Sequence, residues 1–186
     1  MKGKTIVLGV CGGIAAYKAC DIVRKIRERQ GDVHVILTKA AQQFVTPLTL
    51  QTLSLHPVHT DLFSLTEEQQ IGHIALADKA DLIVIAPATA DIIARIAHGH
   101  CDDLLTTVIC ATQAPIVMCP SMNVHMWDNA ITRENVKKLT GLGFHILEPE
   151  IGDLACGTVG KGRLTEPEKI VAELEKLLSS RLREIK

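Results

Sequence analysis

The chain has 186 residues, 47% of them apolar, and a formal net charge of −1. This length supplies one sizeable hydrophobic core, so we expect a single domain over residues 1–186. The balanced charge and the few aromatic residues argue against a nucleic-acid binder, which usually has a basic surface and aromatic side chains for base stacking. No apolar run approaches the roughly 18 residues of a membrane span.

Apolar, β-rich runs alternate with helical patterns along the chain. The runs are almost continuously apolar, which is typical of parallel strands covered by helices on both faces. We therefore predict an α/β protein with a three-layer α/β/α, Rossmann-like fold and a parallel sheet. The predicted strands are residues 5–10, 33–38, 82–86, 116–119 and 144–147. The predicted helices are residues 15–29, 47–53, 74–79, 91–97, 103–111, 133–140 and about 167–181, and residues 64–70 form an exposed loop.

The amino terminus leads directly into the first strand. Lys2 and Lys4 precede that strand and then a glycine turn, rather than the small-residue cleavage site of a signal peptide. None of the six cysteines lies in a CxxC motif, so we expect reduced thiols. Both features indicate a cytoplasmic protein.

A glycine turn joins the first predicted strand to the first helix at residues 12–15, Gly-Gly-Ile-Ala. Backbone amides and the helix dipole hold phosphate at such turns. The turn lacks the GxGxxG spacing, and the second strand ends at Thr38 and Lys39, where a dinucleotide fold places an acidic residue. The pattern favours a mononucleotide phosphate over NAD; a tight turn without a ligand is the alternative.

Two further loops follow predicted strands. The loop Pro-Ala-Thr-Ala-Asp at residues 87–91 has small side chains that let a flat ring approach the backbone, although Thr89 or Asp91 can equally be an ordinary N-cap. Asn123, in Pro-Ser-Met-Asn, follows a buried strand at the edge where ligands collect. Its alternative role is to cap the helix that contains residues 129–139.

Two histidine motifs carry groups suited to catalysis or metal binding. His73 begins a short helix after a polar segment, so it can reach a cleft and act as a general base, or it can be structural. His98, His100 and Cys101 offer no helical i,i+4 pair and no distant matching ligands, so we expect no metal.

Residues 152–163 contain four glycines, which in a compact domain is typical of a mobile segment, and we predict a substrate lid. Cys156 lies within it, where a thiol can be delivered to a closed site. Lys161 and Arg163 can meet an anionic substrate. A surface loop with an incidental cysteine is the alternative.

Together these motifs resemble one family. The sequence GGIAAYK at 12–18, His73, PATAD at 87–91, PSMN at 120–123, and ACG with GKGR at 155–163 stand in the order found in the homo-oligomeric flavin-containing cysteine decarboxylases, in particular the phosphopantothenoylcysteine decarboxylases. The resemblance covers about residues 4–178. It implies an FMN enzyme of coenzyme A biosynthesis that converts 4′-phosphopantothenoylcysteine to 4′-phosphopantetheine. Thiol oxidation to a thioaldehyde, loss of CO₂ and reduction of the enethiol are the implied steps.

The resemblance also assigns residues. The implied catalytic residues are Cys156 as proton donor, His73 at the thiol oxidation and Asn123 as hydrogen-bond partner of the substrate carboxylate. An amide suits that last role, because a fixed cation would resist loss of the carboxylate. The implied FMN contacts are Gly12, Gly13, Ile14, Ala15, Thr38, Pro87, Ala88, Thr89, Ala90, Asp103 and Thr106. The implied substrate contacts are Asn123, Met122, Ala155, Gly157, Lys161 and Arg163.

Two residues depart from the family pattern. Cys11 stands where serine or threonine is common, and Asp91 where many relatives have asparagine, which puts these two FMN contacts in doubt. The family pattern further implies a homotrimer with FMN at subunit contacts, or trimers joined into a dodecamer. Bifunctional members continue into a ligase domain that joins cysteine to phosphopantothenate.

Three alternatives share the fold. A flavin prenyltransferase is not expected to carry both the PxMN motif and the ACG segment. A lantibiotic-type peptide decarboxylase matches less well in the predicted lid. A non-enzymatic regulatory flavoprotein has no need of the proton donor Cys156.

Overall fold

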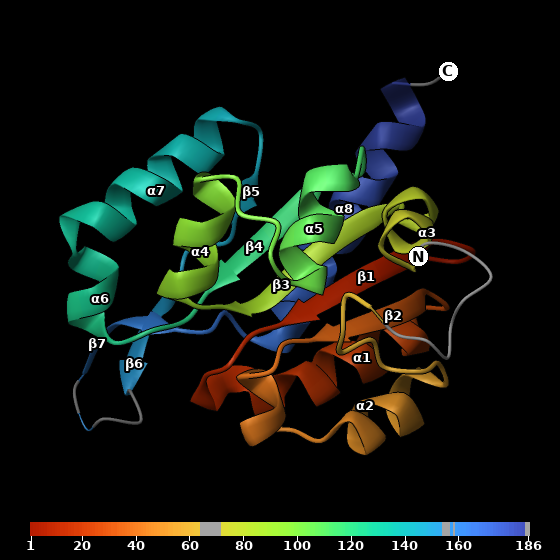
Figure 1. Cartoon of the computed structure of the whole chain (residues 1–186), viewed down its shortest axis with the longest axis horizontal. Coiled ribbons are helices and arrows are strands. Elements are labelled where there is room, and N and C mark those ends of the chain that lie inside the picture. The colour runs from red at the N-terminus through yellow and green to blue at the C-terminus, as the bar shows by residue number, and fades with distance from the viewer. Residues whose placement is uncertain (64–71, 154–156, 158, 185–186) are drawn as a thin grey trace.

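The computed structural model describes residues 1–63, 72–153, 157 and 159–184, with the side chains of residues 181–184 outside the description. A five-stranded parallel sheet in the order β2-β1-β3-β4-β5 forms the centre, and helices cover both faces (Figure 1). The strands are β1 (Thr5–Val10), β2 (Asp32–Leu37), β3 (Leu82–Ala88), β4 (Ile116–Pro120) and β5 (His145–Ile146). The predicted three-layer α/β/α fold with a parallel sheet is confirmed.

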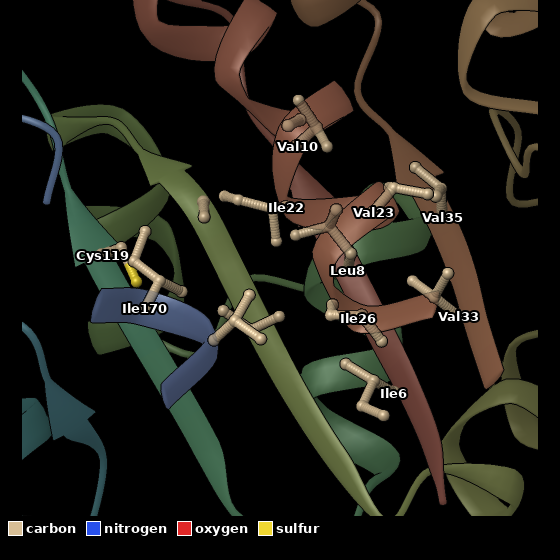
Figure 2. Close-up of a cluster of buried hydrophobic side chains, with 14 of the residues drawn as sticks. Ile6, Leu8, Val10, Ile22, Val23, Ile26, Val33, Val35, Cys119 and Ile170 are labelled. Atoms are coloured by element: carbon tan, nitrogen blue, oxygen red, sulfur yellow. The ribbon is translucent and has the colours of Figure 1, made fainter. Parts of the chain in front are cut away.

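Burial on both faces explains why the strands are so apolar. Every residue of β3 and β4 is buried. In β1, alternate side chains enter two separate cores, with Ile6 and Leu8 on one face of the sheet and Val7 on the other. Figure 2 shows the first of these cores, where Ile22 and Ile26 lie against the side chains of β1.

Two sets of helices cover the two faces. The first core is closed by α1 (Ala19–Glu28), α2 (Pro47–Ser54) and α8 (Pro167–Glu184). The second is closed by α3 (Gly72–Lys79), α4 (Ala90–Ala97), α5 (Leu104–Ala111) and α7 (Ala130–Gly141). Within the described ranges, no helix is both long and apolar enough to cross a membrane.

The chain contains short helices that the sequence pattern did not predict. The first predicted helix begins as a 3-10 helix, η1 (Ile14–Lys18), before α1, and a second 3-10 helix, η2 (Ala41–Gln43), follows β2. A five-residue helix, α6 (Val124–Asp128), comes directly after Asn123. Tight turns of this kind carry too few residues to produce a helical hydrophobic period.

Both ends of the predicted substrate lid, residues 152–163, are strands, and its role as a lid stays a prediction. Two strands, β6 (Glu150–Asp153) and β7 (Val159–Arg163), form an antiparallel pair beside α6 (Figure 1). The sequence pattern did not predict these strands, because they are rich in glycine, which has a low β propensity. Glycine is required at position 160 by close packing, because a Cβ there would lie 2.9 Å from Val124 Cγ2. The predicted loop at residues 64–70 lies outside the described residues.

Candidate functional site

A cleft of about 1470 Å³ lies at the carboxyl-terminal edge of the parallel sheet. The loops after β1, β2, β3 and β4 all line it, together with β7. The strand order reverses between β1 and β3, and ligands of doubly wound sheets bind beyond the strand ends at such a reversal. The volume exceeds the roughly 300–1,000 Å³ of common ligand pockets, so the cleft has room for two molecules.

The loop after β1 has the geometry of an anion-binding turn. Gly13 is extended (φ −166°, ψ 163°) and precedes η1, and no side chain of the described residues caps this helix. Ile14 and Ala15, at the uncapped start, line the cleft. A Cβ on Gly12 would lie 2.4 Å from the Cβ of Ala40, so only glycine lets the loops after β1 and β2 touch. An uncapped helix start with small neighbours fits a phosphate group.

The loop after β2 adds a hydroxyl and an ammonium to the same wall. Thr38 and Lys39 line the cleft. The Oγ1 atom of Thr38 accepts a hydrogen bond from the Ala41 amide (3.2 Å), which fixes the turn into η2. Lys39 is exposed and makes no ion pair with any residue that the structure describes. The loop therefore presents an uncompensated positive charge beside the glycine turn.

The end of β3 is joined to the residue that follows β1. The Cys11 amide donates to the Pro87 carbonyl (3.3 Å). Thr89 Oγ1 accepts from the Ile92 amide (3.2 Å), so Thr89 caps α4, which is one of the two roles left open for this loop. Burial raises the pKa of the Cys11 thiol to about 12. At neutral pH, Cys11 is therefore an uncharged, compact side chain in the cleft wall.

An arginine with three acidic neighbours borders the cleft near the start of α5. Arg95 pairs with Asp102 and, through Nη1, with Asp103 Oδ2 (2.6 Å), and it lies 4.0 Å from Asp91 Oδ2. The other oxygen of Asp103 accepts from the Thr106 amide (2.8 Å) in a capping box. Both oxygens of Asp103 are thus occupied within the chain. The three carboxylates outnumber the single guanidinium, so this group of four side chains carries a net negative charge.

Asn123 caps a helix and lines the cleft at the same time. Its Oδ1 atom accepts from the His125 amide (2.8 Å), which places Asn123 as the N-cap of α6. Asn123 is therefore a helix cap, but the predicted helix was wrong: Asn123 caps α6, whereas Asn129 caps the longer helix α7. Capping uses the amide oxygen, and a ligand role for Asn123 is compatible with it because the side chain has a second polar group, NH₂.

Helix α6 has only five residues and depends on tertiary contacts. Its Trp127 is 0% exposed, and Arg133 lies over the indole ring at 4.7 Å. Burial of a large side chain of this kind stabilises by about 2–3 kcal/mol. On the other side, the Met122 amide donates to the Gly162 carbonyl of β7 (3.0 Å). The sheet core and the hairpin together fix Asn123.

Two cations, at the ends of η1 and β7, share one carboxylate at the cleft. Lys18 Nζ lies 3.2 Å from Glu166 Oε1, and Arg163 pairs with the same oxygen. Burial disfavours the ionised Glu166, but the hydrogen bond and charge of Lys18, together with Arg163, outweigh it and lower the pKa of Glu166. Since Lys18 and Arg163 both line the cleft, this wall carries a net positive charge toward a ligand.

Most of the predicted site residues meet in this cleft. Those that line it are Gly12, Gly13, Ile14, Ala15, Thr38, Pro87, Thr89, Ala90, Asp103, Met122, Asn123 and Arg163. The two departures from the family pattern, Cys11 and Asp91, line it as well.

Other predicted residues lie elsewhere in the described structure. Ala88 is buried in the sheet, and Thr106, 1% exposed, is bonded to Asp103. Lys161 pairs with Glu148, and Gly157 does not line the cleft. Ala155 and Cys156 lie outside the described residues.

His73 is near the start of α3 and does not line the cleft. Its Nδ1 atom is buried and has no hydrogen-bond partner in the described structure. A buried imidazole nitrogen without a partner is unusual. Such a nitrogen is compatible with a proton-accepting role.

The sequence pattern missed the ion pairs and the apolar rim of the cleft. Lys18 and Glu166 are 148 residues apart, so no local signal joins them. Four large apolar side chains line the cleft while remaining largely exposed: Ile14 (59%), Tyr17 (57%), Phe63 (85%) and Met126 (48%). Exposed apolar groups around a cleft are typical of a surface that another molecule covers.

Comparison with known proteins gives consistent results. The flavoprotein family profile matches residues 1–179. The coenzyme A biosynthesis bifunctional proteins CoaBC of Vibrio vulnificus (strain YJ016) and Bacillus subtilis (strain 168) are 50% and 48% identical over 94% and 95% of this chain. The aligned parts are 44% and 43% of those proteins, so the chain spans less than half the length of the relatives it matches.

Two solved structures have the same fold along almost the whole chain. A cysteine-to-serine mutant of a PPC decarboxylase complexed with pantothenoylaminoethenethiol is similar with a TM-score of 0.84 and 28% identity, covering 96% of this chain and 100% of that one. The FMN binding protein AtHal3 has a TM-score of 0.82 and 30% identity, covering 96% and 98%.

Proposed function

The chain belongs to the flavoprotein family, and from this premise we propose that it binds FMN and decarboxylates 4′-phosphopantothenoylcysteine to 4′-phosphopantetheine in coenzyme A biosynthesis. The observation that carries the proposal is that an uncapped glycine helix start and Asn123 open into one cleft. A phosphate-bearing cofactor and a carboxylate substrate can meet there. The similarity to CoaBC proteins and to a PPC decarboxylase supports the same reaction.

The residues of the cleft fit FMN. The amides after Gly13, the Thr38 hydroxyl and the Lys39 ammonium suit its phosphate. The small side chains of the loop after β3 suit a flat ring, because they let it approach the backbone. When bound, FMN supplies two-electron oxidation of the substrate CH₂–SH group and returns two electrons after CO₂ has left.

Three side chains are assigned to the substrate. The Asn123 amide hydrogen-bonds the carboxylate without the lasting attraction of a cation, so departure of CO₂ is not opposed. His73 takes the thiol proton at the oxidation step. Its buried Nδ1 atom, which has no hydrogen-bond partner among the described residues, supports this role. Cys156 donates the proton that converts the enethiolate carbon to CH₂ as hydride is returned. Atoms balance, because the two hydrogens removed at oxidation are replaced at reduction.

The remaining contacts are assigned to substrate binding and assembly. Lys18 and Arg163 suit the substrate phosphate, because both line the cleft and share a single carboxylate. We propose a homotrimer, or trimers joined into a dodecamer. The exposed apolar rim of the cleft supports this proposal, because a neighbouring subunit would bury it. A ligase domain in a longer protein is proposed from the bifunctional relatives. The free thiols of Cys11, Cys20, Cys101, Cys110 and Cys119 support a cytoplasmic, reducing location.

The test is anaerobic incubation of the FMN-loaded protein with 4′-phosphopantothenoylcysteine, followed by measurement of CO₂ and 4′-phosphopantetheine. Wild type is expected to form both. Cys156→Ser is expected to release CO₂ but to accumulate a product two hydrogens lighter, because reduction lacks its proton donor. Cys101→Ser, at an exposed cysteine that does not line the cleft, serves as the matched control and should turn over like wild type.

If wild type binds FMN and leaves this substrate intact, the decarboxylase proposal fails. A flavin prenyltransferase or a non-enzymatic regulatory flavoprotein would then explain the FMN site. If FMN itself is not retained, the proposed cofactor is wrong and the phosphate-type loop serves another ligand.

A further inference from the structure

A cluster of polar side chains lies toward the amino-terminal end of β2, away from the carboxyl-terminal edge that forms the cleft. Asp32 and His34 are on β2, His56 follows α2, and Lys79 ends α3. None of the four lines the cleft. In the part of the chain that the structure describes, Asp32, His34 and His56 are the one group of three side chains with metal-ligand atoms close together.

The local structure holds these three residues in place. Asp32 and His34 are fixed by the pairing of β2 with β1. His56 is fixed by Ser54, which is 0% exposed and whose Oγ accepts from the His56 amide (3.2 Å). The position of His56 is thus set by a buried neighbour and does not depend on a free surface loop.

The ligand atoms have the spacing of a small metal site. His56 Nε2 lies 2.5 Å from Asp32 Oδ1, and His34 Nε2 lies 3.3 Å from Asp32 Oδ2. One ligand atom from each of the three residues falls within 4.8 Å of the others. Two ligands of a tetrahedral ion with bonds of about 2.0–2.2 Å stand roughly 3.4 Å apart. Small side-chain adjustments therefore suffice to close the three groups on one ion.

A lysine ammonium already occupies the position of a cation in this cluster. Lys79 Nζ lies 2.8 Å from His34 Nε2 and 3.8 Å from Asp32 Oδ2. An ammonium can only donate, so the His34 nitrogen facing it carries a lone pair, which is the form that binds metal. The Lys79 side chain is 50% exposed and can turn into water when another cation arrives.

We propose that Asp32, His34 and His56 form a binding site for a divalent transition-metal ion with the ligand preference of Zn²⁺, and that Lys79 competes for the same place. Two imidazoles and one carboxylate suit Zn²⁺ and its first-row neighbours, whereas Mg²⁺ and Ca²⁺ take oxygen ligands. The predicted absence of a metal concerned a different motif, His98 to Cys101. The proposed site is independent of the FMN reaction.

The ion would join β2 to the segment that follows α2. His56 leads into residues that pair with β2, where the His59 amide donates to the Val35 carbonyl (2.9 Å). The chain then continues to Thr60 and Phe63, which line the cleft. A metal at Asp32 would therefore brace the segment that forms one wall of the cleft.

The test is calorimetric titration of the chelator-stripped protein with Zn²⁺ near neutral pH, in a background of Cys101→Ser and Cys110→Ser that removes the described exposed thiols. We expect one Zn²⁺ at the cluster. His56→Asn should weaken its binding by about tenfold or more. Lys79→Met should strengthen it, because the competing ammonium is gone. His100→Asn, at an exposed histidine elsewhere, is the matched control and should change nothing.

Equal affinity of wild type, His56→Asn and Lys79→Met for Zn²⁺ would overturn the proposal, as would no binding at all. Circular dichroism in chelator checks that each variant is folded. If His56→Asn does not fold, Lys79→Met decides alone, since Lys79 is half exposed: tighter Zn²⁺ binding supports the site, and unchanged binding refutes it. A Co²⁺ titration gives a second readout, because a site without thiolate lacks the intense sulfur charge-transfer absorption.

Discussion

At the scale of single residues, Asn123 combines a structural and a proposed chemical role. Its amide oxygen caps α6, and its position in the cleft is the one assigned to the substrate carboxylate. Asp and Ser cap helices about as well as Asn does. Neither can offer a carboxylate the same NH₂ donor, so substitution can separate the two roles.

Asn123→Asp is predicted to keep the stability of wild type within about 0.5 kcal/mol and to lower the decarboxylation rate by about 100-fold or more, because a donor is lost and a like charge is gained. Asn123→Ala should lose about 1 kcal/mol of stability as well, because it removes the cap. Urea unfolding and turnover measure the two effects. Full turnover by Asn123→Asp would show that Asn123 is only a cap.

A second prediction for a single residue concerns Glu166 and the pH dependence of stability. Its pKa is lowered on folding, because Lys18 and Arg163 outweigh the opposing effect of burial. Its ionised form therefore stabilises the protein above the unfolded pKa of about 4.3, and this contribution is lost as the pH falls through the lower folded pKa.

Glu166→Gln is accordingly predicted to be less stable than wild type at neutral pH, with a difference that shrinks as the pH falls below about 4. Urea unfolding midpoints at a series of pH values give the measurement. Glu134→Gln, at an exposed glutamate on α7 without an ion pair in the described structure, is the control. A difference that stays constant with pH would mean that Glu166 acts through packing rather than charge.

At the scale of elements, the contact between β7 and α6 positions one wall of the site. Gly160 and Val124 leave no space for an added methyl group, since its carbon would lie 2.9 Å from Val124 Cγ2. The position of the hairpin therefore depends on the close approach of the Gly160 backbone to the Val124 side chain.

Gly160→Ala is predicted to destabilise the protein by about 1–2 kcal/mol by overpacking this contact. Adding Val124→Ala should recover part of the loss, because it removes the atoms that the new methyl group meets. A double-mutant cycle by urea unfolding measures the coupling. Strictly additive effects of the two substitutions would contradict the proposed contact.

Elements with a strong period were predictable, and elements fixed by distant contacts were not. The strand predicted at residues 5–10 coincides with β1, because its apolar run is buried on both faces. Helix α6 and the strands β6 and β7 escaped prediction, since Trp127 packing and the Gly160 contact stabilise them from outside. The loop residues of the site could be predicted because each loop directly follows an apolar strand. The Lys18–Glu166 pair could not, because its partners are 148 residues apart.

At the scale of the whole molecule, the cleft is edged by apolar groups that face solvent in the single chain. Tyr17 and Ile14 are more than half exposed and adjoin the glycine turn. A second copy of the chain that covers this rim would remove its apolar surface from water. The proposed trimer would therefore be formed at the cofactor site itself.

Light scattering of the FMN-loaded protein is predicted to give the mass of three or twelve chains. Tyr17→Asp should shift the mass toward that of one chain and weaken FMN retention in parallel, because a charge would be buried in the contact. Leu142→Asp, at an equally exposed apolar residue away from the cleft, should leave both unchanged. A single-chain mass for wild type would contradict the proposed assembly.

The helix start after Gly13 has no side-chain cap among the described residues. Under the proposed function, the missing hydrogen-bond acceptor arrives only with the phosphate of FMN, so cofactor binding and folding are thermodynamically linked. Newly made chains would remain open to proteases near this turn until they are loaded. The amount of protein that a cell retains would then follow its supply of flavin. The protein would accumulate only in cells with enough FMN to occupy it.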